Sequence, residues 1–573
     1  MRILFTAAVA SMLAAAAAQQ GSVAIHVDAA AGLGPLSPMW AMFGYDEPNY
    51  TYTENGKKLL GELAAASPVP VYVRAHNLLT SGDGTPALKW GSTNAYTEDS
   101  AGRPRYDWTI VDRIFDAYVQ RKMKPLVEIG FMPEALSTHP DPYRHHWAAG
   151  TNAALYTGWS YPPRDYDRWR EIVSAWARHA IDRYGTREVE SWYWEVWNEP
   201  DIGYWHGTPE EYQQLYDYAA DGLKRVLPAA RIGGPTVTGP NGERTQQFLR
   251  GFLEHCARGT NYATGRTGAP LDYVSFHAKG APRVVDGPST ALGTGHVRMG
   301  LANQLKAIDN GFAIVASFPE FKNTPIIIGE SDPEGCAACG VATNPENAYR
   351  NGTMYSSYTV EQLARTYELA DRHGVNLRGA LTWAFEFEGQ PYFAGFRDLA
   401  TNGLDKPVLN AFRMLGEMRG QRVRVESSGA LSLDAVRDGG VRGTPDIGAL
   451  ASRDDRSVTV LLWNYHDDDL PADAAAIDLA VDGLPRTTVT IAHERIDSDH
   501  SNSYEAWKRM GSPQPPSAAQ LAQLETAAQL AAVEPIRRLQ TRDGRIQLSF
   551  PLPRQGVSLI RVSWDKGRSA PTP

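Results

Sequence analysis

The sequence contains little cysteine and no excess of basic charge. Only three of its 573 residues are cysteine, namely Cys256, Cys336 and Cys339. A single C-x-x-C pair supplies half the ligands of a structural zinc site, which argues against a zinc centre. Lys and Arg number 56 and Asp and Glu 65, a formal net charge of −9, whereas a nucleic-acid partner favours a basic face. We therefore expect no metal or other cofactor and no nucleic-acid partner.

Long apolar runs are absent after the first 18 residues. Met1 and Arg2 precede an alanine-rich apolar run that ends near Ala18, and polar residues follow it. A short basic head, an apolar run and small residues are typical of a secretory signal. The alternative, a membrane span, would need about 20 apolar residues. We expect residues 1–20 to be a signal peptide and the mature protein to be soluble, without a membrane partner, and periplasmic or secreted.

Strand-like and helix-like patterns alternate from residue 36 to residue 415. This alternation predicts an α/β fold, a (β/α)8 TIM barrel. The expected strands are residues 38–45, 68–76, 124–132, 189–199, 231–236, 271–277, 324–330 and 376–385. The amphipathic segments between them include residues 165–183, 209–226, 245–255, 297–316 and 358–373.

The pattern changes after about residue 415 to short β-like runs separated by Gly, Pro and Asp, which is typical of a β-sandwich. The clearest runs are residues 457–463, 487–492, 545–550 and 557–562. We predict a sandwich over residues 416–566, joined by a strand within residues 21–35 and followed by a tail at residues 567–573. A helix expected at residues 517–531 interrupts the sandwich. Its leucines at positions 521, 524 and 530 are interpreted as packing residues rather than as a partner surface.

Two carboxylates come at the ends of expected barrel strands. An aromatic run leads into Asn198, Glu199 and Pro200, and an apolar run over residues 324–329 leads into Glu330. The carboxyl ends of the strands carry the catalytic groups of TIM-barrel enzymes. A pair of carboxylates presented from two strands is the minimum equipment of a retaining glycosidase.

Further motifs accompany these two carboxylates. They are VRAH at residues 73–76, EIGFMPEAL at 128–136, WNEP at 197–200, LWNY at 462–465 and HSNSY at 500–504. Together, over nearly the whole mature chain, they resemble glycoside hydrolase family 39, which contains β-xylosidases and α-L-iduronidases. The resemblance implies an enzyme whose substrate is an oligosaccharide or another glycoside.

The resemblance implies a role for each carboxylate. Glu199 would be the general acid and base, with its pKa raised by an apolar shell that includes Trp194 and Trp197. Glu330 would be the ionised nucleophile that forms a glycosyl-enzyme ester, and the two carboxyl groups of a retaining pair stand about 5–5.5 Å apart. Asn198 would hydrogen-bond the 2-hydroxyl group of the sugar. Neither carboxylate requires a metal ion.

The resemblance also implies substrate contacts at other strand ends. His76, His277 and Trp383 match positions that hold the glycone, the sugar whose bond is cleaved. A satisfied core histidine is the alternative for His277, and plain core packing is the alternative for Trp383. Glu388 resembles a glutamate that binds ring hydroxyl groups in the xylosidases, and Glu386 is its rival.

Two cationic side chains bear on the choice of substrate, and a third bears on the charge of Glu330. Residues 271–281 resemble the iduronidases, in which the lysine that matches Lys279 contacts the uronate carboxylate; pairing of Lys279 with Glu386 or Asp332 is the alternative. The iduronidase loop that supplies further carboxylate contacts is not recognisable, and Arg397 is the one substitute for it. Arg74 either pairs with Glu330 and keeps it ionised or is structural.

We therefore favour an exported, exo-acting, retaining β-xylosidase that releases xylose from xylo-oligosaccharides. The second hypothesis is an α-L-iduronidase-like uronide hydrolase, or a galactosidase or arabinosidase of the same family. The third is an inactive carbohydrate-binding barrel, which the joint presence of both carboxylates and Asn198 disfavours. In an exported chain, Cys336 and Cys339 either form a small loop disulfide or stay free, and Cys256 is expected to be a buried thiol.

Overall fold

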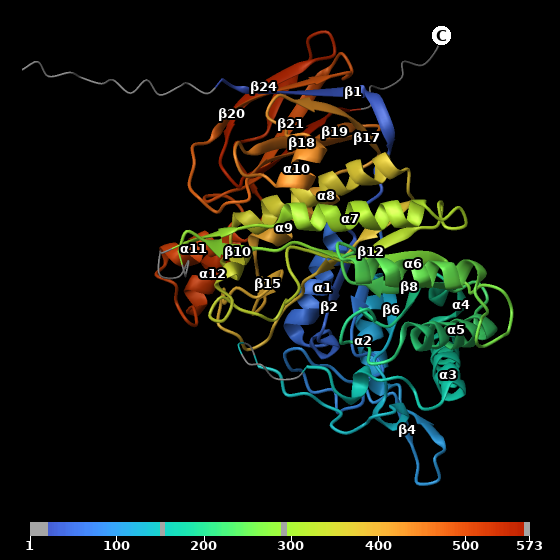
Figure 1. The fold of residues 1–573 in the computed structure, drawn as a ribbon. Coiled ribbons are helices and arrows are strands. Elements are labelled where there is room, and N and C mark those ends of the chain that lie inside the picture. The colour runs from blue at the N-terminus through green and yellow to red at the C-terminus, as the bar shows by residue number, and fades with distance from the viewer. Residues whose placement is uncertain (1–20, 149, 151–154, 288–294, 566–573) are drawn as a thin grey trace, which may run out of the picture.

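The computed structural model describes residues 21–148, 150, 155–287 and 295–565, which form a barrel with a β-rich part beside it (Figure 1). The expected signal peptide at residues 1–20 and the tail at residues 567–573 lie outside the described residues. Among the described residues, no helix is both long and apolar enough to cross a bilayer.

Eight parallel strands form the closed barrel, so the predicted (β/α)8 fold is confirmed. Its last strand is split at Leu381 into β13, which pairs with β12, and β14, which pairs with β2 and closes the ring. Each segment expected to be a barrel strand overlaps one, and β8, β9 and β12 extend one or two residues beyond the expected ends. The barrel strands are β2 (Met42–Tyr45), β3 (Tyr72–Ala75), β6 (Lys124–Ile129), β7 (Tyr193–Val196), β8 (Arg231–Val237), β9 (Tyr273–Lys279), β12 (Ile326–Asp332), β13 (Leu377–Ala380) and β14 (Thr382–Trp383).

Helices surround the barrel, and local sequence signals set their limits. In α5, Thr208 and Glu211 form a capping box, and Pro209 occupies the first turn, where its missing N–H needs no partner. The apolar face of α5, including Leu215 and Leu223, is buried. These helices are α1 (Glu54–Ala66), α2 (Thr109–Val119), α3 (Tyr166–Tyr184), α4 (Thr186–Val189), α5 (Pro209–Val226), α6 (Glu243–Arg258), α7 (Leu301–Ala316), α8 (Thr353–His373) and α9 (Pro407–Gly416).

Short elements lie in the loops of the barrel. The β4–β5 hairpin projects at the end of the molecule farthest from the β-rich part (Figure 1). The short strands are β4 (Tyr96–Glu98), β5 (Pro104–Tyr106), β10 (Arg283–Val285), β11 (His296–Arg298), β15 (Ala400–Thr401) and β16 (Leu404–Asp405). The short 3-10 helices are η1 (Pro48–Tyr50), η2 (Glu134–Leu136), η3 (Gly158–Ser160) and η4 (Pro345–Asn351).

Ten strands form one mixed sheet in the β-rich part, in which β1 joins two groups of C-terminal strands. Strand β1 pairs antiparallel with β17 and parallel with β20, so the N-terminal strand lies beside residues more than 380 positions later. Strands from both ends of the sheet, including β20, β24 and β21, enclose one apolar core. The strands are β1 (Val23–Pro35), β17 (Gln421–Ser427), β18 (Asp446–Arg453), β19 (Ser457–Tyr465), β20 (Ala475–Asp482), β21 (Thr488–Ile496), β22 (Ala531–Ala532), β23 (Arg537–Gln540), β24 (Ile546–Leu552) and β25 (Val557–Ser563).

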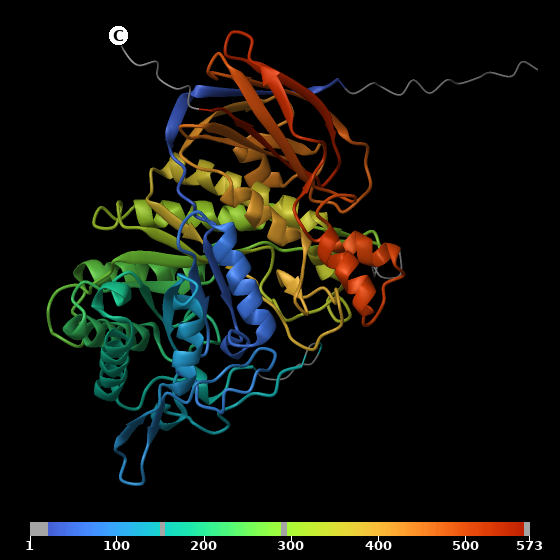
Figure 2. The same cartoon turned by 180° about the vertical axis from the view of Figure 1, so that it is seen from behind.

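Three helices belong to the C-terminal part: α10 (Leu433–Gly439), α11 (Ser503–Arg509) and α12 (Ala518–Ala527). Figure 2 shows α11 and α12 packed together beside the barrel, on the side where α1 faces the viewer. The helix expected to reach residue 531 ends at Ala527, because Ala531 pairs with β21 as part of β22. Leu524 is buried in a small cluster with Phe393, which agrees with its interpretation as a packing residue.

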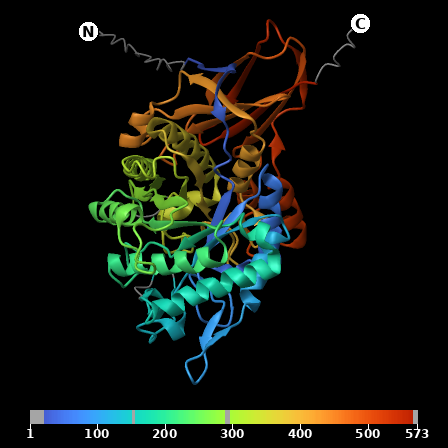
Figure 3. The same ribbon diagram turned by 90° about the vertical axis from the view of Figure 1, so that its right-hand side faces the viewer.

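Helices α7, α8 and α9 lie between the barrel and the mixed sheet (Figures 1 and 3). A buried ion-pair network connects the two parts there. Arg365 of α8 contacts Glu361 on the same helix at 2.9 Å and Asp446 of β18 at 2.7 Å. The barrel is thus fixed to the sheet on the side of α8, and the loops after its strands remain available to build a site.

Candidate active site

The turn after β7 presents Glu199. Trp197 and Glu199 both have left-handed backbone conformations, with φ of 73° and 43°, which residues other than glycine seldom adopt. The backbone N–H of Glu199 donates to the carbonyl oxygen of Thr236 on β8 at 3.0 Å. This bond anchors the turn to the neighbouring strand and brings the Glu199 side chain to the mouth of the barrel.

Glu330 of β12 faces the same space as Glu199. One carboxylate oxygen of each residue and a ring nitrogen of His277 all lie within 4.8 Å of one another. The Glu199 side chain is 14% exposed and that of Glu330 is 6% exposed. The structure therefore brings both sequence-predicted carboxylates together and largely buries them.

His277 of β9 connects the two carboxylates. Its Nδ1 lies 2.8 Å from Glu199 Oε1 and 3.7 Å from Glu330 Oε1. The side chain is fully buried, and its Nε2 has no hydrogen-bond partner among the described residues. A side-chain carbon on Gly329 would lie 3.1 Å from Nε2, so glycine at that position gives the ring its space. His277 is thus a core histidine that also contacts both members of the pair.

Positive charge surrounds Glu330. Lys279 Nζ lies 2.6 Å from its Oε2, and Arg74 Nη1 lies 3.3 Å from its Oε1. Burial is the largest single influence and raises the pKa of Glu330, but Lys279, the two histidines and Arg74 together outweigh it, and the pKa lies well below 4.5. Glu330 is therefore held as a carboxylate. Glu199, His277 and Glu330 also lie close enough to hold a metal ion, but these cations already balance the charge of Glu330.

Arg74 of β3 lies in the barrel interior and is fully buried. It donates to Glu195 Oε2 at 2.6 Å and contacts Glu128 Oε2 at 2.8 Å. A third donation, at 3.0 Å, reaches the side-chain oxygen of Asn198. Together with its contact to Glu330, Arg74 therefore fulfils both interpretations made from the sequence. It is a structural ion-pair centre and a partner of the carboxylate.

His76 and Trp383 meet at Asp46, which follows β2. His76 Nδ1 lies 2.6 Å from Glu128, and its Nε2 lies 3.3 Å from Asp46 Oδ1 and 3.7 Å from Glu330 Oε1. The indole N–H of Trp383 donates to Asp46 Oδ1 at 3.1 Å. The ring centroids of His76 and Trp383 are 4.3 Å apart. His76 thus lies next to Glu330, and Trp383 packs on His76.

Gly44 of β2 gives Trp383 its position. A side-chain carbon on Gly44 would lie 2.4 Å from the Trp383 ring and 2.8 Å from the carbonyl oxygen of Arg74. Real atoms do not approach so closely, so the ring packs on the strand only because residue 44 is glycine. Trp383 is buried, as the packing alternative required, and its backbone N–H donates to Asp332 Oδ1 at 2.9 Å.

Lys279 bridges two acids. In addition to Glu330 it contacts Asp332 Oδ2 at 2.8 Å. The sequence singled out Asp332 only as a possible pairing partner of Lys279. Its position two residues after Glu330 could have indicated that Asp332 lies at the site, because alternate residues of a strand point to the same face.

Glu388, Glu386 and Arg397 have other surroundings. Glu388 is partly exposed and accepts from Asn55 of α1 at 3.0 Å. Glu386 is buried and accepts from the backbone N–H of Gly403 at 2.6 Å, and burial raises its pKa to about 8. Arg397 is fully buried, forms an ion pair with Glu334 and donates to the carbonyl oxygen of Trp383. None of their described contacts is with Glu199 or Glu330.

The aromatic shell expected around Glu199 needs one correction. Trp194 points away from the barrel interior and packs on Trp176 of α3, with ring centroids 5.7 Å apart. The reason is strand alternation, since its neighbour Glu195 points inward to Arg74. Trp197 belongs to the turn itself, and its indole N–H donates to the carbonyl oxygen of Tyr204.

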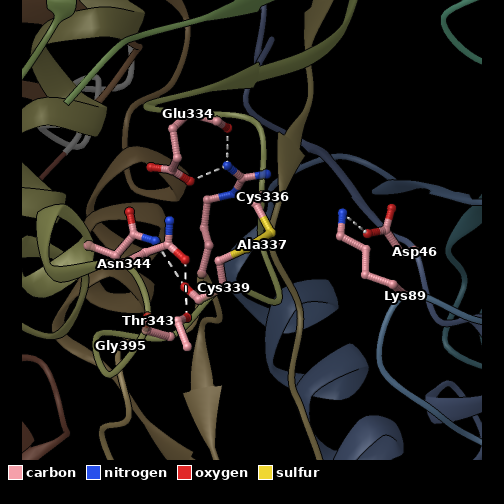
Figure 4. Close-up of a disulfide and its surroundings, with 12 residues drawn as sticks. Asp46, Lys89, Glu334, Cys336, Ala337, Cys339, Thr343, Asn344 and Gly395 are labelled. Atoms are coloured by element: carbon pink, nitrogen blue, oxygen red, sulfur yellow. Dashed lines mark hydrogen bonds and ion pairs between the residues drawn. A yellow bond between two sulfur atoms is a disulfide. The ribbon is translucent and has the colours of Figure 1, made fainter. Parts of the chain in front are cut away.

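The disulfide Cys336–Cys339 lies in the loop after β12 (Figure 4). The buried guanidinium of Arg350 donates to the carbonyl oxygens of Cys336 and Cys339 at 2.7 and 2.8 Å. Cys256 is a free, buried thiol, and burial raises its pKa. The loop that follows Glu330 and Asp332 is therefore held by a covalent bond and by a buried cation.

Comparison with known proteins places this architecture in a family. The profile described as "Glycosyl hydrolases family 39" matches residues 23–547. A β-xylosidase of Caldicellulosiruptor saccharolyticus is 27% identical over 430 residues, which cover 73% of this chain and 76% of that protein. An α-L-iduronidase of Canis lupus familiaris is 28% identical over 574 residues, which cover 94% of this chain and 78% of that protein.

A solved structure shows the same fold. The crystal structure of a monomeric β-xylosidase from Caulobacter crescentus CB15 covers 94% of this chain and 99% of its own, with a TM-score of 0.72 and 21% identity. The profile match extends over most of the chain and includes both Glu199 and Glu330. This protein therefore belongs to glycosyl hydrolase family 39 and is a glycoside hydrolase.

Proposed function

We propose that the protein is an exported, exo-acting, retaining glycosidase that releases xylose from xylo-oligosaccharides. Its family makes a carbohydrate the substrate. In the first step Glu330 attacks the anomeric carbon while Glu199 protonates the departing oxygen. In the second step Glu199 removes a proton from the water that hydrolyses the glycosyl ester and restores both carboxyl groups.

The observation that carries this proposal is the short separation of the two carboxylates: one oxygen of Glu199 and one oxygen of Glu330 lie at most 4.8 Å apart. Inverting glycosidases keep about 6.5–9.5 Å between their carboxyl groups to admit a water molecule, whereas retaining ones keep about 5–5.5 Å. The separation supports direct attack by a carboxylate.

The unequal surroundings of the two carboxylates support the assignment of roles. Glu330 has two cations within 3.3 Å, so it stays charged as a nucleophile must. Glu199 is more exposed, and His277 is its one side-chain partner among the described hydrogen bonds. Two carboxylates in unlike environments are typical of an acid and nucleophile pair.

Asn198 supports the same assignment. Its Oδ1 accepts from Arg74, which leaves the side-chain NH2 group as the donor that can face the sugar. We assign this NH2 group to the 2-hydroxyl of the glycone. That hydrogen bond strengthens as positive charge develops on the sugar ring in the transition state.

A neutral glycone is favoured by the state of the pocket cations. Lys279 already contacts two carboxylates, Glu330 and Asp332. Arg397, the one substitute for the missing iduronidase contacts, is fully buried against Glu334. A uronate would add a further negative charge beside Glu330 and Asp332 and would compete with them for Lys279.

Exo action and export have separate support. The small exposed fractions of Glu199 and Glu330 suit a pocket that accepts one chain end. The proposal of export depends on the sequence pattern of residues 1–20, which lie outside the described residues. The Cys336–Cys339 disulfide adds to it, since such bonds persist in oxidising compartments.

A uronide hydrolase is the second candidate, because the Lys279 side chain is 16% exposed in an otherwise buried cluster and could meet a carboxylate. A panel of aryl glycosides separates the two. Turnover of the α-L-iduronide without turnover of the β-xyloside would contradict the xylosidase proposal. At pH 7, Lys279→Ala should reduce kcat/KM for a uronide about 10- to 100-fold more than for a xyloside, because only the uronide loses a charge-assisted hydrogen bond.

The proposed mechanism is tested at Glu330. Glu330→Gln should lower kcat at least about 10³-fold, because glutamine has nearly the same shape but cannot form the ester. Proton NMR of the first product should show the β-anomer of xylose. Unchanged sugar release by Glu330→Gln, or an α-anomer as the first product, would contradict the double-displacement mechanism.

A further inference from the structure

Lys89 is a buried lysine to which the proposed two-step reaction gives no role. It belongs to the loop between β3 and α2, and its side chain is 10% exposed. Lys89 lines a pocket together with His76, Asp46 and the aromatic side chains of Phe131, Trp159 and Tyr204. Lysines are seldom buried to this degree without a specific partner.

The ammonium group of Lys89 has unused hydrogen-bonding capacity. Its Nζ donates to Asp46 Oδ2 at 2.8 Å, the contact drawn at the right of Figure 4. This is the one side-chain partner of Lys89 among the described hydrogen bonds. An ammonium group has three N–H donors, so two remain for the pocket. Burial is the largest single influence and lowers the pKa of Lys89, but Asp46, Glu47 and Glu330 together outweigh it, so the pKa is raised and the group stays charged.

The backbone around Lys89 is fixed from both sides. Its N–H donates to Glu47 Oε1 at 2.7 Å, and its carbonyl oxygen lies 2.9 Å from His145 Nε2. The indole N–H of Trp159 donates to the other ring nitrogen of His145 at 3.2 Å. Lys89 has a left-handed backbone conformation, with φ of 55°, which lysine seldom adopts. The loop therefore aims this side chain into the pocket.

Lys279 contacts Glu330 directly, whereas Lys89 is connected to it through Asp46 and His76. Asp46 holds Lys89 with Oδ2 and contacts His76 Nε2 with Oδ1, and His76 Nε2 lies 3.7 Å from Glu330 Oε1. Lys279 contacts the other oxygen of Glu330. A sugar whose anomeric carbon lies at Glu330 would therefore come next to His76, which Asp46 connects to Lys89.

We propose that Lys89 is a specificity-determining residue, whose ammonium group donates a hydrogen bond to a hydroxyl oxygen of the glycone while Asp46 holds it in place. The proposal rests on the proposed function, because it requires the glycone to lie against Glu330. The aromatic faces of Phe131, Trp159 and Tyr204 would border the same sugar. The competing explanation is that Lys89 only neutralises the charge of Asp46.

Removing either partner of the hydrogen bond distinguishes these explanations. The substrates are the aryl glycoside that the wild type hydrolyses fastest and its single-deoxy analogues, each of which lacks one ring hydroxyl. The wild type should lose about 10- to 100-fold in kcat/KM on one analogue, because a charged donor is left without its acceptor. Lys89→Met should hydrolyse that analogue and the parent at equal kcat/KM.

A structural role predicts another result. Lys89→Met would then react more slowly with every substrate. The ratio of kcat/KM between the parent and each deoxy analogue would stay as in the wild type, and this result would overturn the proposal. Lys122→Met is the matched control, because Lys122 is also left-handed, with φ of 59°, but is exposed. It should retain the wild-type rates and ratios.

Two further measurements complete the test. If Lys89→Met does not fold, as judged by its melting temperature, Lys89→Gln takes its place in the same comparison. Lys89→Arg, which keeps the charge, should preserve most of the discrimination. Failure of the proposed function is a separate result, in which the wild type hydrolyses no glycoside of the panel, and that result would overturn this proposal with it.

Discussion

Replacing Lys279 by methionine should raise the pKa of Glu330 and move the acidic limb of the pH–rate profile upward. Lys279 Nζ lies 2.6 Å from Glu330 Oε2. With an effective dielectric constant near 20, two unit charges at this distance attract each other by about 6 kcal/mol. One pKa unit corresponds to about 1.4 kcal/mol, so the upper bound is about 4–5 units. Structural relaxation and solvent screening reduce it, so the pKa of Glu330 should rise by less than this bound.

The sign follows from the role of Glu330. The pKa of Glu330 is held well below 4.5 in the wild type, and a nucleophile reacts only as the carboxylate. The acidic limb that Glu330 sets should therefore lie below pH 4.5 in the wild type and appear at higher pH in Lys279→Met. Asp332 adds to the effect, because it loses its partner at 2.8 Å and stays close to Glu330.

The assay is kcat/KM for an aryl glycoside between pH 3.5 and pH 8. Lys279→Arg, which keeps a positive charge, is the control and should retain most of the wild-type profile. An acidic limb at the same pH in wild type and Lys279→Met would refute the reasoning. It would mean that Arg74 and burial, rather than Lys279, decide the protonation of Glu330.

Three predictions concern stability and can be checked by melting temperature. The pKa of Glu386 is raised to about 8, so the wild type loses stability as pH rises from about 4.5 to 8. Glu386→Gln should remove up to about 5 kcal/mol of this loss. Equal pH dependence of the two proteins would contradict this prediction. Arg365→Met leaves Glu361 buried without its cation and should destabilise by about 3–5 kcal/mol, whereas an unchanged melting temperature would exclude this role. Replacing Cys336 and Cys339 by serine opens a loop of sequence separation 3 and should cost about 2 kcal/mol; a much larger loss would show that the loop is not held by its hydrogen bonds.

The barrel could be predicted because its signals are local. Each strand is an apolar run bounded by turn residues, and each helix has its own cap and apolar face, as α5 shows with Thr208 and Glu211. The same local signals placed Glu199 and Glu330 at strand ends. The closure of the barrel across the break at Leu381 had no such signal, since it depends on β14 meeting β2.

The less predictable part of the site comes from loops and from the facing of strand residues. Lys89 has a polar, glycine-rich neighbourhood in the sequence, and only the fold brings it to Asp46. Trp194 was expected near Glu199 because the two are close in sequence. Alternation along β7 turned it to α3 instead.

The sequence by itself determined the class of this protein. Apolar periodicity, turn residues and two acids at strand ends are properties of short segments, and they sufficed for the barrel, the family resemblance and the carboxylate pair. Only the tertiary structure decided the electrostatics of the pocket. The charge on Glu330 depends on Lys279 and Arg74, which lie 51 and 256 residues away along the chain. Coulomb interactions depend on distance in space, and the fold alone sets that distance.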